Sequence, residues 1–120
     1  MFGKKSIKNK NLLELVPVKL VGSEMKEDGK ASLLIPRFKS KFLLNFLPKN
    51  KSPFVKINLD DFGTGFWNIA DNQKTVEQIG VELKEKFGDA IEPVYERLNI
   101  FISQLRRQGF MELKDPKEEK

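Results

Sequence analysis

The sequence predicts an α+β fold in which a three-stranded antiparallel sheet is followed by three helices. Three observations predict it: β-branched runs bounded by prolines in the first half, helix-start signals between residues 60 and 78, and apolar residues at helical spacing over residues 91–108. A chain of 120 residues with 39% hydrophobic and 32% charged residues has an ordinary globular composition. It is long enough for one domain with a core of modest size.

The first two strands are predicted to form a hairpin. Leu15–Val21 has the β-branched content of a strand, and Pro17 confines that strand to a sheet edge or to its own start. A polar bend over residues 24–30 contains Asp28-Gly29, which is typical of a tight turn. Ala31–Ile35 is the returning strand, and it ends before a proline.

The third strand is predicted at Phe54–Leu59, directly after a proline. Side chains alternate between the two faces of a strand. Val55, Ile57 and Leu59 therefore share one face, and the polar Lys56 and Asn58 point to the other.

The first two helices follow this strand closely. Asp60 is a candidate N-cap of the first helix, and Asp71-Asn72 ends that helix. Thr75 is the N-cap of the second helix, with Gln78 three residues later as its capping-box partner. The second helix then runs over Val76–Phe87.

The third helix has the clearest periodicity. Its apolar positions run from about Ile91 to Gln108, with Pro93 in the first turn, where a missing N–H costs nothing. Gly88 ends the preceding helix, and Gly109 ends this one. Phe110–Lys114 follows as a candidate short strand.

Three strands followed by three helices predict a winged helix-turn-helix domain over residues 12–114. A flexible basic tail over residues 1–11 precedes it, and a charged tail over residues 115–120 follows.

Residues 37–53 form a basic, aromatic insert between the second and third strands. Phe38, Phe42 and Phe46 recur at helical spacing before Pro48, which predicts a short amphipathic helix. The insert is interpreted as a satellite of the core, and weak contact with a membrane surface is the alternative.

Cysteine and histidine are both absent. This excludes thiolate and imidazole metal ligands, disulfides, and catalytic triads built on these residues. A carboxylate-only magnesium or calcium site stays open, but Asp60-Asp61 lacks the spaced ligands of a calcium loop and is explained by a helix start. We expect no metal, no cofactor and no catalytic activity.

The charge distribution favours a partner for the first half of the chain. Through Lys56 there are thirteen basic residues against four acidic ones, and the remainder has nine against thirteen. No apolar run approaches the ~18 residues that span a bilayer. No apolar segment of a secretory signal follows the lysines of residues 4–10, so we expect a cytoplasmic protein.

A winged helix serves either DNA binding or peptide capture. The exposed face of the third helix mixes acidic, basic and neutral side chains, and the second helix carries Glu77, Glu82 and Glu85, which phosphate would repel. The sequence therefore favours peptide capture, with a DNA-binding transcriptional regulator as the alternative.

One run of residues is similar to a known family. A strand ending at Leu59, a small-residue helix with the pair Phe66-Trp67, and the pattern Asp71-x-x-x-Thr75-Val76-x-x-Ile79 resemble the PqqD family, coenzyme PQQ synthesis protein D. The resemblance covers roughly Leu15–Leu113. The run over residues 60–65 and the insert depart from the family pattern, and they leave open whether the substrate is the PQQ precursor.

The resemblance implies a non-catalytic recognition element for a ribosomally synthesised precursor peptide. The leader of the precursor would add as a strand beside the third strand, and the complex would be presented to a modifying enzyme, often a radical S-adenosylmethionine (SAM) enzyme. Ile57→Pro is expected to remove a ladder donor and abolish binding. The implied peptide-binding residues are Val55, Lys56, Ile57, Asn58 and Leu59 on the strand and Tyr95, Leu98, Asn99 and Ile102 on the third helix.

Two further features of the first helix predict packing. Trp67 is interpreted as a core anchor. Gly63 and Gly65 each cost ~1 kcal/mol in a helix relative to alanine, which indicates a close approach of another helix.

Overall fold

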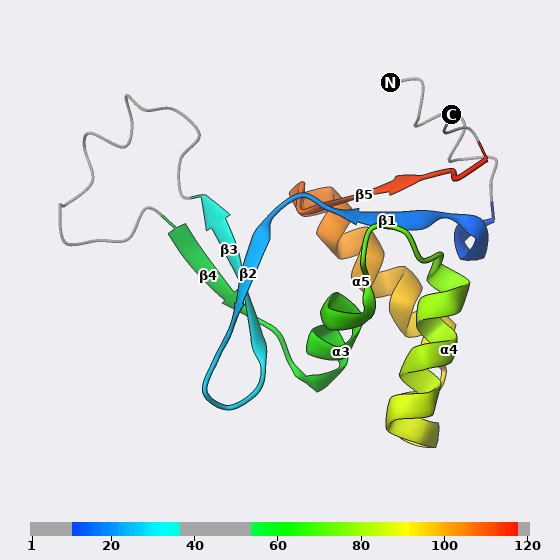
Figure 1. Ribbon diagram of the computed structural model, residues 1–120, viewed down its shortest axis with the longest axis horizontal. Coiled ribbons are helices and arrows are strands. Elements are labelled where there is room, and N and C mark those ends of the chain that lie inside the picture. Colours follow the sequence, from blue (N-terminus) through cyan, green and yellow to red (C-terminus); the bar gives the residue numbers. More distant parts are fainter. Residues whose placement is uncertain (1–10, 37–53, 118–120) are drawn as a thin grey trace, which may run out of the picture. The chain divides into compact units, whose positions relative to one another are not determined.

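The structure is a computed structural model that describes residues 11–36 and 54–117 (Figure 1). The described residues form two compact units, one from residues 21–64 and one from the rest. Almost all of the basic tail (residues 1–10) and the whole of the insert (residues 37–53) lie outside the described residues, as does the predicted helix ending at Pro48. Within the described ranges, no helix combines the length and the hydropathy that a membrane crossing requires.

The unit of residues 21–64 contains a three-stranded antiparallel sheet in the order β2-β3-β4. Its strands are β2 (Gly22–Met25), β3 (Ala31–Pro36) and β4 (Phe54–Asn58). The β2–β3 turn contains Gly29 at φ 84°, a left-handed conformation that glycine adopts without strain. The side chain of Asp28 accepts a hydrogen bond from Lys30 N at 2.9 Å. The predicted Asp28-Gly29 turn is therefore confirmed.

The first strand of this sheet differs from the prediction. The hairpin partner of β3 is Gly22–Met25, which lies between the predicted strand Leu15–Val21 and the predicted bend and overlaps the start of that bend. The β-branched segment instead forms β1 (Val16–Lys19), which pairs with β5 (Met111–Lys114) in a separate two-stranded sheet. All four residues of β2 are exposed, so the strand lacks the apolar pattern that marks a half-buried strand.

The second unit combines the β1–β5 pair with helices (Figure 1). These are α4 (Val76–Phe87), α5 (Val94–Gln108) and most of α3 (Asp61–Ile69), with the 3₁₀ turns η1 (Leu12–Glu14) and η2 (Gly88–Ile91). In Figure 1, β1 and β5 run side by side, and α4 and α5 lie below them in this view. The predicted strand after the third helix is confirmed as β5.

The core of this unit lies between the helices and the β1–β5 pair. At its centre the ring of Phe66 meets Phe101 edge-on, with 5.4 Å between ring centroids. The buried apolar side chains are Leu15, Val16, Phe66, Trp67, Ala70, Val76, Ile79, Leu83, Ile91, Val94, Leu98, Ile102, Leu105, Met111 and Leu113.

The helix signals before α4 are confirmed. Asp71 Oδ1 accepts hydrogen bonds from Gln73 N and Lys74 N, beyond the end of α3. Thr75 Oγ1 accepts from Gln78 N, and Gln78 Oε1 accepts from Thr75 N, which completes the capping box.

The third helix begins later than predicted, at Val94 instead of Ile91. Glu92 is extended, with φ −70° and ψ 146°, because the residue before a proline avoids the helical region. Pro93 is consequently the residue that precedes the helix. Gly109 ends the helix at φ 84°, and Phe110 N donates to Leu105 O at 2.9 Å, as predicted for the C-terminus.

The α+β class, the three-stranded antiparallel sheet and three helices are therefore present in the described part of the chain.

Thr75→Ala is expected to lower the free energy of unfolding by about 1 kcal/mol. The change removes the hydroxyl that satisfies Gln78 N, while the Thr75 backbone keeps its own partner. Denaturant titration of the variant and of Thr75→Ser measures the effect. Serine keeps the acceptor, so equal losses in both variants would contradict a capping role.

Candidate functional site

The edge of β4 is the centre of the predicted peptide-binding site. Among the described strands, β4 is the last in the order β2-β3-β4, so one of its sides has no strand beside it there. All five of its residues are exposed, including the apolar Val55 at 38% and Ile57 at 37%. An edge of this kind can pair with another extended chain.

The hydrogen-bond pattern shows which backbone groups face that edge. Leu59 N donates to Ala31 O at 2.9 Å, and these residues extend the β3–β4 register by one position beyond the Ser32–Asn58 pair. Lys26 N donates to Lys30 O at 2.8 Å, so the backbone of the even-numbered Lys30 faces β2, whereas that of the odd-numbered Ala31 faces β4. The other odd-numbered residues of β3 therefore also turn their backbone groups toward β4. In an antiparallel ladder this direction alternates with every residue.

It follows that the N–H and C=O groups of Val55 and Ile57 face β3, whereas those of Lys56 and Asn58 face the outer edge. The N–H of Ile57 is therefore a donor within the sheet, and contact of Ile57 with a peptide stays a prediction. The outward donors at this edge are the N–H groups of Lys56 and Asn58.

The side chains of β4 divide between two faces. Lys56 and Asn58 share a face with Glu24 and Ser32, according to the registers of the sheet. Lys56 Nζ reaches diagonally over β3 to Glu24 Oε2 at 2.8 Å, and both side chains are exposed.

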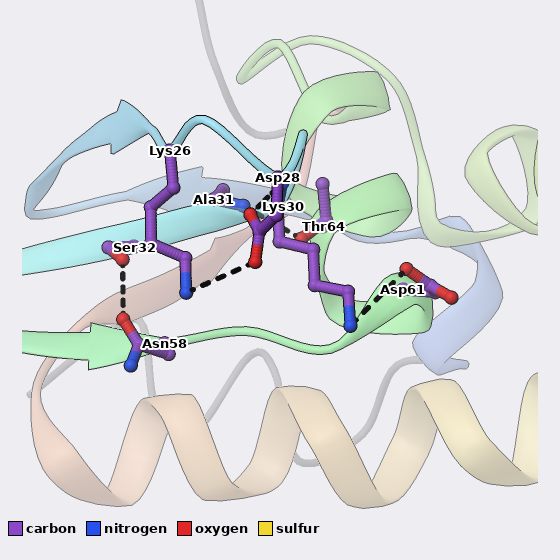
Figure 2. A network of polar contacts seen from close by, with 8 residues as sticks. All are labelled: Lys26, Asp28, Lys30, Ala31, Ser32, Asn58, Asp61 and Thr64. Atoms are coloured by element: carbon purple, nitrogen blue, oxygen red, sulfur yellow. Dashed lines mark hydrogen bonds and ion pairs between the residues drawn. The ribbon is translucent and has the colours of Figure 1, made fainter.

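Figure 2 shows the polar contacts that hold the end of β4. The buried Ser32 donates from Oγ to Asn58 Oδ1 at 2.6 Å. Ala31 N donates to Thr64 Oγ1 at 2.9 Å, so the first turn of α3 is bonded to β3. Buried hydrogen bonds fix geometry because an unpaired group there is costly. The β4 edge is therefore held by bonds on its inner side.

The two carboxylates after β4 have structural roles. Asp60 Oδ1 accepts from Gly63 N at 2.8 Å, which confirms the predicted cap. Asp61, in the first turn of α3, lies 4.0 Å from Lys30 Nζ. In the described part of the chain, no cluster of three or more acidic residues is placed to hold a metal ion.

On α5, Tyr95 packs against α4. A Cβ added at Gly80 would overlap the Tyr95 ring, and the Tyr95 hydroxyl donates to Glu77 O at 3.0 Å. Burial raises the pKa of Tyr95, and the nearby charge of Glu77 adds to the shift. The tyrosine therefore fixes the contact between the two helices.

The other three predicted α5 residues differ in exposure. Leu98 and Ile102 are buried with the core, and Asn99 is exposed. These residues belong to the unit that does not contain β4. Their contact with a peptide stays a prediction.

Trp67 is buried, as expected of a core residue. Lys19 Nζ lies 5.2 Å from the centroid of its ring, and burial lowers the pKa of this lysine, although Asp71 opposes the shift. A Cβ at Gly65 would lie 2.8 Å from Phe87 Cε2, so a close helix approach is confirmed for this glycine.

The exposed face of α4 is acidic. Glu77, Glu82 and Glu85 line an open depression of about 400 Å³ together with Lys74, Gln78 and Val81. A nucleic-acid backbone would meet repulsion on this face. This charge disfavours α4 as a DNA-contacting helix.

Glu24, Ser32 and Thr64 were not identified from the sequence as residues that shape the β4 edge. Ser32 is 26 positions from its partner Asn58, and Thr64 is 33 positions from Ala31. No local pattern connects partners so far apart. A strand prediction at Gly22–Met25 would have placed Glu24 near Lys56.

Residues 55–111 match the model of the family described as coenzyme PQQ synthesis protein D (PqqD). Over these residues the chain is similar to the PqqD family, and the resemblance seen in the sequence is confirmed there. The match begins within β4 and ends at the first residue of β5. Comparisons with curated proteins and with solved structures gave no match.

Proposed function

We propose that this PqqD-like chain is a non-catalytic adaptor that binds the leader of a ribosomally synthesised precursor peptide and presents it to a modifying enzyme, such as a radical SAM enzyme. The observation that carries the proposal is the β4 edge, where Lys56 and Asn58 turn their backbone outward beside the exposed Val55 and Ile57. A leader would add to the sheet as a further strand.

The exposed edge suits an extended ligand for two reasons. The inner side of β4 is already fixed by the Ser32–Asn58 bond and by Leu59 N, so the edge need not be ordered on binding. Each added main-chain hydrogen bond contributes about 0.5–1.5 kcal/mol, and apolar contacts at Val55 and Ile57 add selectivity.

The proposal includes a winged helix-turn-helix arrangement, with Tyr95, Leu98, Asn99 and Ile102 beside the bound leader. Of these, Asn99 is exposed and can meet a ligand without repacking of the core. The family match supports the peptide partner, since the matched family is named for PQQ synthesis. The PQQ precursor peptide is therefore the first leader to test.

Lys56→Pro is expected to reduce leader binding at least tenfold, because it removes the outward N–H and places a ring at the edge. Proline is tolerated on edge strands where the N–H faces solvent, so the fold should persist. The measurement is a titration of the labelled protein with the PQQ precursor leader, in which the chemical shifts of the backbone amides are monitored. Shifts should concentrate on residues 54–59.

Lys56→Gln is the matched control, since it removes the charge and keeps the N–H. It should bind the leader clearly more tightly than Lys56→Pro does. Equal loss in both variants, or shifts confined to α4, would contradict strand addition. Modification of the precursor by this chain alone would contradict the adaptor role.

A further inference from the structure

The face alternation of β4 determines which ligand side chains meet which protein side chains. An added strand continues the sheet, so its residues beside Val55 and Ile57 lie on the face of those two side chains. The residue between them lies on the face of Lys56. This holds for a parallel or an antiparallel ligand, because side chains alternate in both.

The two faces offer different chemistry to the added strand. Val55 and Ile57 are apolar and partly exposed, and Met25 on the same face of β2 is also exposed. On the opposite face, Lys56 is the charged residue of β4, with 56% of its side chain exposed. Cross-strand neighbours of opposite charge stabilise a sheet, and like charges destabilise it.

Building on the proposed function, we infer that the segment added to β4 has the pattern apolar–acidic–apolar, with the acidic residue beside Lys56. Glu24 is the internal competitor for the lysine. It holds Lys56 Nζ at 2.8 Å over β3, and a ligand carboxylate has to draw the ammonium group back toward the edge.

The competition is weak enough for a ligand to succeed. Both partners of the Glu24–Lys56 pair are exposed, and exposed ion pairs contribute little to stability. A second copy of β4 is a poorer occupant, because antiparallel self-pairing centred on Lys56 sets two lysines opposite each other.

The test uses three synthetic peptides with central leucine–X–leucine, in which X is glutamate, glutamine or lysine and all flanking residues are identical. Amide shifts on β4 of the full chain give each dissociation constant. We expect glutamate to bind most tightly and lysine most weakly, with steps of about two- to fivefold. Replacing both leucines with serine should weaken all three peptides.

Glu24→Gln should strengthen binding of the glutamate peptide about two- to fivefold, because the competing carboxylate no longer holds Lys56. Glu27→Gln is the charge-matched control on the exposed turn of the same unit. It should leave the dissociation constants of the three peptides in the same order and with the same ratios. Lys56→Gln should remove the difference in affinity between the glutamate peptide and the glutamine peptide.

The outcomes separate the two proposals. Shifts on β4 with equal affinity for all three peptides would overturn the acidic preference and leave strand addition standing. No β4 shift with these peptides or with the PQQ precursor leader would overturn strand addition itself. Shifts on β4 that appear on concentrating the protein alone would assign the edge to a second copy and overturn the inference.

Discussion

Phe66→Ala is expected to lower the free energy of unfolding by about 3–5 kcal/mol. The side chain is completely buried, and its ring meets Phe101 edge-on at 5.4 Å. Alanine removes most of the buried apolar surface and leaves a cavity that close-packed neighbours fill only in part. Loss of the aromatic pair adds to the effect.

Denaturant titration measures this loss. Phe66→Leu should lower the free energy of unfolding clearly less than Phe66→Ala, because leucine keeps most of the apolar volume. Val81→Ala is the surface control, since Val81 is 48% exposed on α4, and it should change stability by no more than about 0.5 kcal/mol. A Phe66→Ala value as small as that of Val81→Ala would show that Phe66 is not part of the packed core.

Ile57→Pro is expected to destabilise the protein by about 2–4 kcal/mol, because it removes a ladder hydrogen bond and leaves the carbonyl of the buried Leu33 unpaired. The N–H of Ile57 faces β3, whereas that of Lys56 faces the edge. Two prolines one position apart therefore have different effects.

Thermal unfolding with and without leader peptide separates these effects. Ile57→Pro should have a lower melting temperature without ligand, and Lys56→Pro should stay close to the parent chain but fail to gain stability from the leader. The reverse ranking would mean that the backbone direction along β4 is opposite to the one described.

Local signals predicted the fold where the stabilising partners lie close in sequence. The capping box of Thr75 and Gln78, the Gly88 and Gly109 termini and the Asp28-Gly29 turn are all confirmed. The assignment of strands to sheets was not predictable in this way. Val16–Lys19 has strong β-branched content, but its partner at Met111–Lys114 is set by tertiary packing.

For the site, the alternation of Val55, Lys56 and Ile57 was readable from the sequence, since side chains alternate in any strand. The direction of the backbone groups was not readable, because it depends on the register with Ala31 and Leu33. The apolar periodicity of α5 also could not tell a ligand-facing side chain from a core one. Leu98 and Ile102 are both buried.

The β1–β5 pair has a consequence for how the chain folds. Val16 pairs with Lys114, and the two residues are 98 positions apart (114 − 16). Closing so long a segment is entropically costly, and contacts of this range slow folding. During synthesis β1 emerges long before its partner, so the ladder of Val16–Lys19 cannot form until β5 has been made. The β2–β3 hairpin, whose paired residues are only 6 to 12 positions apart, can form while the rest of the chain is still being made.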